Sequence, residues 1–215
     1  MIKLKQGILI SVEGIDGSGK STLAKTLSEL CTQAGYQTLL TKEPGATPLG
    51  KELREIVQRH RIAVCKEAEY LMFAADRAQH FTDVIIPALS DKALVVSDRM
   101  ADSSLVYQGY GRGLDKDFIA SVNQWAMKGL SPDLVFYVRV PLEVALERIA
   151  RRAENRSVFE KETHDFQQRL LEGFDALAHT NKKFILLDGT QSATHVAQHA
   201  FTYLHEWICT NRLLL

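Results

Sequence analysis

A run of residues near the N-terminus matches the phosphate-binding pattern GxxxxGK(S/T). It extends from Gly14 to Ser21 and reads GIDGSGKS. Glycines let a backbone wrap closely round a phosphate with its N–H groups pointing inward, and a helix that begins near the lysine adds the positive end of its dipole. Lys20 brings a positive charge to the β- and γ-phosphates, and the Ser21 hydroxyl is an oxygen ligand of the kind that Mg²⁺ prefers. The pattern therefore predicts a site for a nucleotide and Mg²⁺.

A second pair of charged residues, Asp98 and Arg99, follows the apolar run at 93–96. An acidic residue at the carboxyl end of a strand is placed to bind Mg²⁺ or its water shell. An arginine beside it can hold a phosphate through paired hydrogen bonds. Alone, the pair fits a solvated loop equally well, but the phosphate-binding pattern elsewhere in the chain favours the functional interpretation.

Short apolar runs alternate with helical patterns along the whole chain, which predicts a doubly wound α/β domain. Such alternation implies right-handed crossovers and a parallel sheet with helices on both faces. Ligands bind these sheets at the carboxyl ends of the strands, where the phosphate-binding pattern and Asp98 fall. The expected strands are 7–12, 36–41, 93–96, 134–138 and 184–187. The expected helices are about 20–34, 48–59, 67–89, 102–110, 115–128, 162–179 and 193–209, with a further helix that has Pro141 in its first turn.

Composition and charge limit the class of protein. The 215 residues include 26 Lys and Arg against 26 Asp and Glu, and 46% are hydrophobic. These are globular values, and a net charge of zero argues against binding a nucleic-acid polymer. We expect no membrane segment, since no apolar run approaches the roughly 20 residues that a span requires. Cys31, Cys65 and Cys209 lack the spacing of a disulfide framework or a zinc site, which favours a cytoplasmic location.

Five segments, in order along the chain, resemble those of the thymidylate kinase family. They are 13–22, 42–48, 71–80, 98–109 and 132–134. The resemblance implies a P-loop NTPase-like fold with a five-stranded parallel sheet over residues 1–215. It also implies transfer of a phosphoryl group from ATP to dTMP, with Mg²⁺ as cofactor, in a bacterial-type homodimer.

The resemblance assigns the residues of the donor side. Lys20 and Ser21 would serve the ATP phosphates and Mg²⁺, and Asp98 would be the second metal ligand. Asp16, inside the loop, would face the acceptor near its 3′-hydroxyl or the metal. The full ATP-binding set is Gly14, Ile15, Asp16, Gly17, Ser18, Gly19, Lys20, Ser21 and Thr22.

The resemblance also assigns the acceptor side. Phe73 would stack on thymine, and Arg77, one helical turn later, would donate to the edge of the base. Arg99 would hold the dTMP phosphate. Tyr107 would crowd the 2′ position and so favour deoxyribose. The remaining expected contacts are Ser104 and Gln108 at base and sugar, and Glu43 in a loop that closes over the acceptor.

Arginines gather after the fourth expected strand, at 148, 151, 152 and 156. Phosphoryl transfer needs neutralisation of charge at the transferring group, and arginines on a mobile lid provide it while excluding water. We expect a lid over about 148–161, with Arg152 and Arg156 as catalytic residues. Because the phosphate loop itself contains no arginine, the chain resembles the lid-arginine type of the family.

Several positions depart from the family's pattern. Lys42 stands where arginine is common, Ala46 where glycine is common, and Met100 where an aromatic residue or histidine is usual. Arg139 replaces a frequent aspartate at the end of the fourth strand. The segment 157–160 displaces the usual lid arginine to Arg156, which leaves the identity of the working arginine open.

Three alternatives remain at this point. A kinase of the same fold with another nucleoside or nucleotide as acceptor would lack the pocket of Phe73 and Arg77. A nucleotide-binding homologue without catalysis would explain the altered lid. A GTPase switch would need an Asn-Lys-x-Asp element after a strand, and the sequence contains none.

Overall fold

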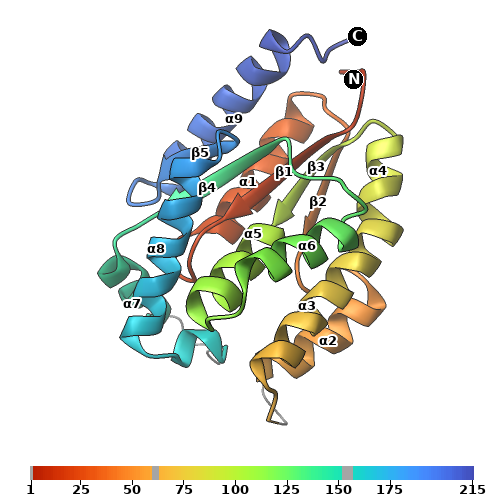
Figure 1. Cartoon of the computed structure of the whole chain (residues 1–215). Helices are drawn as coiled ribbons and strands as arrows, with labels where there is room; N and C mark the ends of the chain where they lie inside the picture. The colour runs from red at the N-terminus through yellow and green to blue at the C-terminus, as the bar shows by residue number, and fades with distance from the viewer. Residues whose placement is uncertain (1, 60–62, 152–156) are drawn as a thin grey trace.

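A computed structural model gives the fold of the chain and describes residues 2–59, 63–151 and 157–215 (Figure 1). Its centre is a five-stranded sheet of order β2-β3-β1-β4-β5, in which every neighbouring pair is parallel. The strands are β1 (Ile8–Glu13), β2 (Thr38–Lys42), β3 (Leu94–Asp98), β4 (Leu134–Arg139) and β5 (Phe184–Asp188). The expected fold class, a P-loop NTPase-like α/β sheet, is confirmed.

The helices fall close to the expected ranges. The α-helices are α1 (Lys20–Gln33), α2 (Pro48–Arg59), α3 (Lys66–His80), α4 (Ile86–Ser90), α5 (Ala101–Ser104), α6 (Lys116–Ala126), α7 (Leu142–Ala150), α8 (His164–Thr180) and α9 (Ala193–Thr210). Two π-helical segments, η1 (Phe81–Ile85) and η2 (Leu105–Gly111), and a 3₁₀ turn, η3 (Phe159–Lys161), complete them. None of the helices in the described ranges is both long and apolar enough to cross a bilayer.

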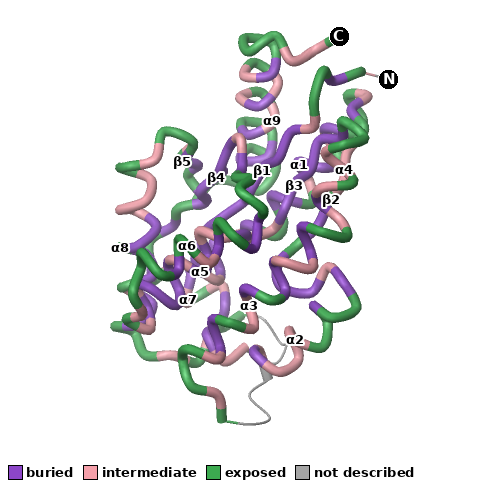
Figure 2. The backbone as a smooth tube through the Cα atoms, turned by 45° about the vertical axis from the view of Figure 1, so that its right-hand side comes forward, coloured by how far each residue is buried: buried purple, intermediate pink, exposed green. Residues whose placement is uncertain are grey.

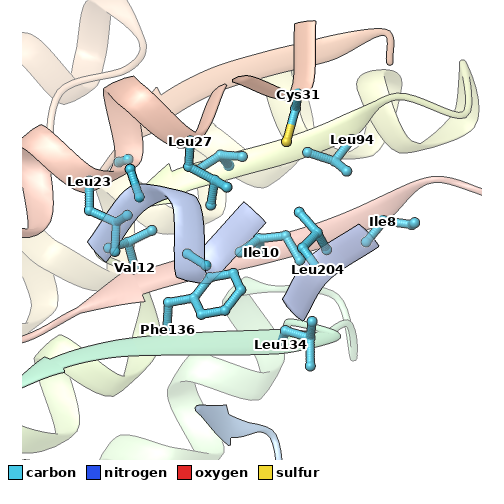
Figure 3. Packing of buried hydrophobic residues seen from close by; sticks show 14 of the residues in the cluster. Ile8, Ile10, Val12, Leu23, Leu27, Cys31, Leu94, Leu134, Phe136 and Leu204 are labelled. Atoms are coloured by element: carbon cyan, nitrogen blue, oxygen red, sulfur yellow. The ribbon is translucent and has the colours of Figure 1, made fainter. Parts of the chain in front are cut away.

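Alternation along the strands builds two cores, one on each face of the sheet. Ile8, Ile10 and Val12 of β1 point to one face and pack against α1 and α9 (Figure 3). Leu9, between them, points to the other face and packs with Phe81 of η1. Successive side chains of a strand point to opposite faces, so a strand covered on both sides is mostly apolar. Figure 2 shows the result, with buried strands inside a shell of helices whose outer surfaces are exposed.

Four helices differ from the expectation. The single helix expected over 67–89 is divided by η1, and the helix expected over 102–110 continues from α5 into η2. The helix expected from 162 begins at His164, because the Thr163 hydroxyl accepts the N–H of Phe166 at 3.3 Å and caps it. Pro141 caps α7 and does not lie within its first turn.

Candidate active site

The phosphate loop connects the end of β1 to the start of α1, which is the context that the pattern requires. Gly17 adopts φ +82°, and a Cβ there would lie 2.4 Å from the carbonyl oxygen of Ala145 in α7. Gly14 adopts φ +148°, and a Cβ there would lie 2.7 Å from the carbonyl oxygen of Val138. Side chains do not fit at these positions, so glycine is required for the loop to turn against β4 and α7.

Two cations converge on the carboxylate of Asp16 in this loop. Lys20 Nζ donates to Asp16 Oδ1 at 3.1 Å and to the Ile15 carbonyl at 3.3 Å. Arg99 Nη2 donates to the same Asp16 oxygen at 2.5 Å. Burial alone would raise the pKa of Asp16, but the charges of Lys20 and Arg99 outweigh it and hold that pKa well below its usual range. Asp98 also lies within the electrostatic influence of both cations. Two cationic side chains that converge at this loop can bind phosphate oxygens.

Arg99 is held in a demanding backbone conformation. Its φ is +72°, in the left-handed region that costs a residue with a side chain about 1–2 kcal/mol. Arg99 Nη1 donates to the Gly14 carbonyl at 3.1 Å and to Ser103 Oγ at 2.9 Å, and Arg99 Nη2 donates to Tyr107 Oη at 3.0 Å. The turn after β3 thereby aims the guanidinium across the sheet's edge at the phosphate loop.

A buried carboxylate, Glu13, supports that turn. It accepts the Met100 N–H at 2.7 Å, the Ser103 hydroxyl at 2.6 Å and the Ser11 hydroxyl at 2.9 Å. Burial, followed by the charge of Asp102, raises the pKa of Glu13 to about 7. Because Ser103 donates to Glu13, its oxygen lone pairs remain available to accept from Arg99.

Asp98 stands at the carboxyl end of β3 with an unused oxygen. Asp98 Oδ1 is buried and has no hydrogen-bond partner among the described residues. Asp98 and Ser21 line a common cavity of about 440 Å³, whose other walls come mainly from β2 and the loop after it. In the described parts of the chain, no group of three or more His, Cys, Asp or Glu residues could hold a metal. A metal here would therefore need ligands from a bound nucleotide as well.

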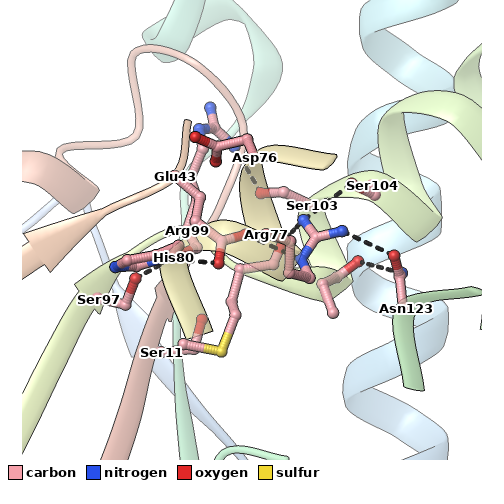
Figure 4. A network of polar contacts seen from close by, with 12 residues as sticks. Ser11, Glu43, Asp76, Arg77, His80, Ser97, Arg99, Ser103, Ser104 and Asn123 are labelled. Carbon is pink, nitrogen blue, oxygen red and sulfur yellow. Dashed lines mark hydrogen bonds and ion pairs between the residues drawn. The ribbon is translucent and has the colours of Figure 1, made fainter. Parts of the chain in front are cut away.

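A second arginine, Arg77 of α3, lies fully buried behind the first (Figure 4). Its Nε donates to Glu43 Oε2 at 2.9 Å and its Nη1 to Asn123 Oδ1 at 2.7 Å. Its Nη2 donates to Ser104 Oγ at 3.1 Å and to the Met100 carbonyl at 3.2 Å. Four of the five guanidinium hydrogens are thus engaged, and one on Nη1 remains.

Glu43, in the loop after β2, neutralises Arg77. It is buried, pairs with Arg77 through Oε2, and accepts from His80 Nδ1 through Oε1 at 3.0 Å. Burial would raise the pKa of Glu43, but the charge of Arg77 and the hydrogen bond from His80 lower it. His80 Nε2 in turn contacts Thr41 Oγ1 at 2.7 Å. Both carboxylate oxygens of Glu43 are therefore occupied by protein groups.

The same loop is fastened to α3 by Asp76. Asp76 Oδ1 accepts the Gly45 N–H at 3.0 Å, while Oδ2 is buried without a partner among the described residues. Burial, followed by the charge of Glu43, raises the pKa of Asp76 to about 6. Arg54 of α2 closes the loop from the other side by donating to the Pro44 carbonyl at 2.8 Å.

Aromatic rings form a wall beside these arginines. The ring centres of Phe73 and Phe159 are 6.1 Å apart, and those of Tyr107 and Phe159 are 5.5 Å apart. Phe73 is half-buried, whereas Tyr107 is buried with its ring 4.9 Å from the Arg99 guanidinium. The wall gives a flat apolar group a surface on which to stack.

The structure brings together most of the residues that the sequence singled out. Asp16, Lys20, Arg99 and Tyr107 form one connected cluster, and Glu43, Arg77 and Ser104 form another. Gln108 lies apart from both and donates to Glu69 at 3.0 Å. Their contacts with substrates remain predictions.

The expected lid falls partly outside the described residues. Arg152 and Arg156 both lie in the segment 152–156, which the structure does not describe. Arg148 donates to the carbonyls of Ser18 at 3.2 Å and Gly189 at 2.9 Å, so it fastens α7 to the phosphate loop. Arg151 is exposed and pairs with Glu147.

Sequence reasoning missed several residues that hold the site together, among them the four that follow. Asn123 and Glu69 hold Arg77 and Gln108, and Ser103 holds Arg99. Arg54 lies within the electrostatic influence of Asp98 and Asp16, and burial lowers its pKa. A polar residue on an otherwise apolar helix face was the available signal for Glu69 and Asn123, but only the packing shows what each one touches.

Comparison with known proteins shows which family has sequences similar to this chain. The model of the family described as thymidylate kinase matches residues 12–200. A thymidylate kinase of Halothermothrix orenii is 38% identical over 91% of this chain and 95% of its own length. One of Carboxydothermus hydrogenoformans is 41% identical over 89% and 93%, and one of a Synechococcus species is 46% identical over 80% and 81%.

Proposed function

The chain belongs to the thymidylate kinase family, and from this we propose that it transfers the γ-phosphoryl group of ATP to the phosphate of dTMP. The bond between the γ-phosphorus and the β–γ bridging oxygen breaks, and an oxygen of dTMP bonds to that phosphorus, giving ADP and dTDP. One observation carries the proposal: Lys20 and Arg99 meet on Asp16 within the segment that matches the family. A kinase with another acceptor and a non-catalytic binder are the less favoured alternatives.

On the donor side, the loop 14–22 surrounds the ATP phosphates with backbone N–H groups at the start of α1. Lys20 would approach the β- and γ-phosphates, and its hydrogen bond to Asp16 positions the ammonium group. Burial and the charge of Arg99 lower the pKa of Lys20. A phosphate group that binds beside Lys20 would raise this pKa again, because its negative charge stabilises the ammonium.

Mg²⁺ is part of the proposal, and the residues fit it. Asp98 offers a buried oxygen without a partner among the described residues, and the Ser21 hydroxyl lines the same cavity. Both are hard oxygen ligands, and the remaining positions would go to phosphate oxygens and water. When bound, the ion would supply charge neutralisation at the transferring phosphoryl group.

On the acceptor side, Arg99 and Arg54 would hold the dTMP phosphate. Arg99 reaches the edge of the phosphate loop, and its anchoring to Ser103 and Gly14 fixes the approach. Arg54 approaches from α2 and is fixed by the Pro44 carbonyl. Two guanidinium groups on opposite sides would orient the attacking oxygen in line with ATP, and such orientation supplies much of the rate enhancement in phosphoryl transfer.

The base would lie against Phe73, with Arg77 donating its remaining N–H to the base edge. Ser104 and Gln108 complete that edge. Glu43 acts through Arg77, since both of its oxygens are occupied within the protein. Because Glu43 cancels the charge of Arg77, this part of the pocket suits a neutral base rather than a phosphate.

The lid, the assembly and the location complete the proposal. Residues 1–215 would form one kinase domain with a lid over about 148–161, in which Arg152 and Arg156 act on the transferring phosphoryl group. The three free cysteines support a cytoplasmic location. A homodimer is supported by exposed apolar side chains on the adjoining helices α3 and α6, namely Leu71, Phe118 and Trp125.

A coupled assay of ADP release tests the proposal. ATP and Mg²⁺ are supplied with dTMP, dUMP, UMP, CMP or thymidine in turn. We expect strong preference for dTMP, and Lys20→Ala should lower kcat by about a hundredfold or more with the fold intact. Turnover of thymidine alone would indicate a nucleoside kinase. ATP binding without turnover of any acceptor would indicate a non-catalytic homologue.

A further inference from the structure

A buried carboxylate, Glu69 of α3, lies against the side-chain amide of Gln108. Gln108 Nε2 donates to Glu69 Oε1 at 3.0 Å. The exposed fractions are only 1% for Gln108 and 2% for Glu69. A carboxylate accepts hydrogen bonds and donates none. The NH₂ group of the amide must therefore face Glu69, and the amide oxygen must lie on the opposite branch.

An ion pair with Arg112 keeps this carboxylate in place. Arg112 Nε and Nη2 donate to the two oxygens of Glu69 at 3.3 Å each. Arg112 Nη1 donates to Glu162 at 2.5 Å, and the guanidinium lies 4.9 Å from the ring centre of Phe166. Flipping the Gln108 amide would set its oxygen against a buried carboxylate and remove a donor from Glu69. The charge on Glu69, held by Arg112, thus fixes which end of the Gln108 amide faces α3.

The contact between Gln108 and Glu69 lies one turn of α3 away from Phe73, the residue expected to stack on the base. Glu69, Phe73 and Arg77 occupy successive turns on one face of α3. Opposite them, Ser104 meets Arg77 at 3.1 Å and Gln108 meets Glu69 at 3.0 Å, so Phe73 lies between two points where the helices are joined. Within the described residues, no protein donor contacts Gln108 Oε1. That oxygen remains available to a ligand.

We infer that Glu69 is a positioning residue for base selection, because it fixes Gln108 so that its amide oxygen is presented as an acceptor to the base edge. The inference rests on the proposed function and deepens it. Thymine carries an N–H at ring position 3 beside a carbonyl oxygen, whereas cytosine carries an unprotonated nitrogen beside an NH₂ group. The acceptor on Gln108 and the donor on Arg77 match thymine and uracil, and they oppose cytosine at both positions.

The test compares kcat/KM for dTMP with kcat/KM for dCMP. In Glu69→Gln the neighbour of Gln108 becomes an amide that both donates and accepts, so Gln108 is free to turn. We expect the ratio of the two kcat/KM values to fall about tenfold or more, mainly through improved use of dCMP. Glu69→Asp, which keeps the charge but withdraws it by one methylene group, should also lower the ratio. An unchanged ratio in either folded variant overturns the inference.

A matched control separates positioning from a general effect on the ion pair. Glu162→Gln removes the other carboxylate of Arg112 and does not touch Gln108, so the ratio should stay at the wild-type value. In a Gln108→Ala background the ratio should already be reduced, and adding Glu69→Gln should change it no further. A further fall in that double variant would show that Glu69 acts by some other route, against the inference.

The outcomes also separate this inference from the proposed function. If wild-type protein phosphorylates none of the pyrimidine monophosphates, the proposed function fails before any variant is examined. If it phosphorylates dTMP and discriminates against dCMP, while both Glu69 variants discriminate equally well, the function stands and the role of Glu69 falls.

Discussion

At the scale of single residues, the two central arginines differ in charge compensation. Arg77 is fully buried and paired with Glu43, so the pair is electrically neutral. Arg99 shares its ion-pair partner, Asp16, with Lys20. A neutral pair suits hydrogen bonding to a base, and two cations that share one ion-pair partner suit a phosphate. The roles proposed for the two arginines follow from this difference between their neighbours.

Tyr107 is expected to select deoxyribose. Tyr107→Ala should raise kcat/KM for UMP relative to dTMP, because the ring that crowds the 2′ position is removed. Tyr107→Phe should keep the preference for dTMP and raise its KM a fewfold, because only the hydroxyl that Arg99 contacts at 3.0 Å is lost. The measurement is steady-state kinetics on both nucleotides. Equal preference in wild type and Tyr107→Ala would remove Tyr107 from the sugar site.

Ser103 is expected to act on dTMP binding alone. Ser103→Ala removes the oxygen that accepts from Arg99 at 2.9 Å, so KM for dTMP should rise by about 5- to 50-fold while KM for ATP stays unchanged. Ser11→Ala is the control, since Ser11 also donates to Glu13 but has no contact with Arg99. An equal rise of both KM values would point to a distorted phosphate loop instead.

The raised pKa of Asp76 predicts that the difference in stability between wild type and Asp76→Asn depends on pH. Burial raises its pKa from 3.8 to about 6, so between these values the unfolded chain releases the proton while the folded protein keeps it. The free energy of unfolding contributed by Asp76 therefore falls as pH rises from about 4 to about 6, and it stays lower above that range. The free energy of unfolding of Asp76→Asn, measured by urea unfolding, should rise relative to that of the wild type by about 2–3 kcal/mol across this range. A constant difference between Asp76→Asn and wild type across this range would contradict the argument.

At the scale of elements, α7 fixes the shape of the phosphate loop. The backbone of Gly17 packs against the Ala145 carbonyl, and Arg148 of the same helix binds the Ser18 and Gly189 carbonyls. The helix thereby joins the loop after β1 to the loop after β5. The loop must bring its N–H groups within hydrogen-bond distance of a phosphate. Its contacts with α7 make it more rigid, so that binding a phosphate costs less ordering of the loop.

The contact with α7 predicts a large cost for any side chain at Gly17. Gly17→Ala combines an unfavourable φ of +82° with a Cβ 2.4 Å from the Ala145 carbonyl oxygen, so unfolding free energy should fall by about 2 kcal/mol or more. Gly113→Ala is the control, because its φ of +73° is similar but nothing lies within 4 Å of the new Cβ. Its cost should stay near 1 kcal/mol, the cost of the backbone conformation alone. If urea unfolding showed equal losses of unfolding free energy in Gly17→Ala and Gly113→Ala, the contact with Ala145 would contribute nothing measurable.

At the scale of the whole molecule, three exposed apolar residues lie on two adjoining helices. Trp125 is 78% exposed, and Phe118 and Leu71 are each just over half exposed. All three belong to α3 and α6, which adjoin in Figure 1 on the side of the sheet that carries the residues proposed to bind dTMP. The helix that presents Leu71 outward also presents Phe73 and Arg77 inward. Assembly through this surface would therefore stiffen the base site.

The proposed homodimer predicts that a substitution in this surface lowers the mass of the protein in solution. Trp125→Glu should shift the protein in sedimentation velocity from the mass of two chains to that of one, because a charge cannot be buried unpaired in an apolar contact. Leu186→Glu, which alters an exposed apolar residue on the distant strand β5, should leave the mass unchanged. A wild-type protein that sediments as a single chain would refute the homodimer.

The sequence by itself determined the sheet, its helices and the nature of the phosphate loop. Alternating apolar strands and helices leave few arrangements that bury every strand, and the loop pattern is local, so its geometry follows from adjacent residues. The ends of elements were less well predicted, as at Thr163, because a single capping hydrogen bond decides where a helix begins.

Only the tertiary structure decided how the site is held together. Glu13 meets Ser103 across 90 positions of sequence, Arg77 meets Asn123 across 46, and Gln108 meets Glu69 across 39. Such pairs leave no periodic trace, because each is a contact between side chains on different elements. Which buried carboxylate faces which donor depends on how helices pack over the sheet. The roles proposed for Arg99 at a phosphate and for Arg77 at a base both depend on that packing.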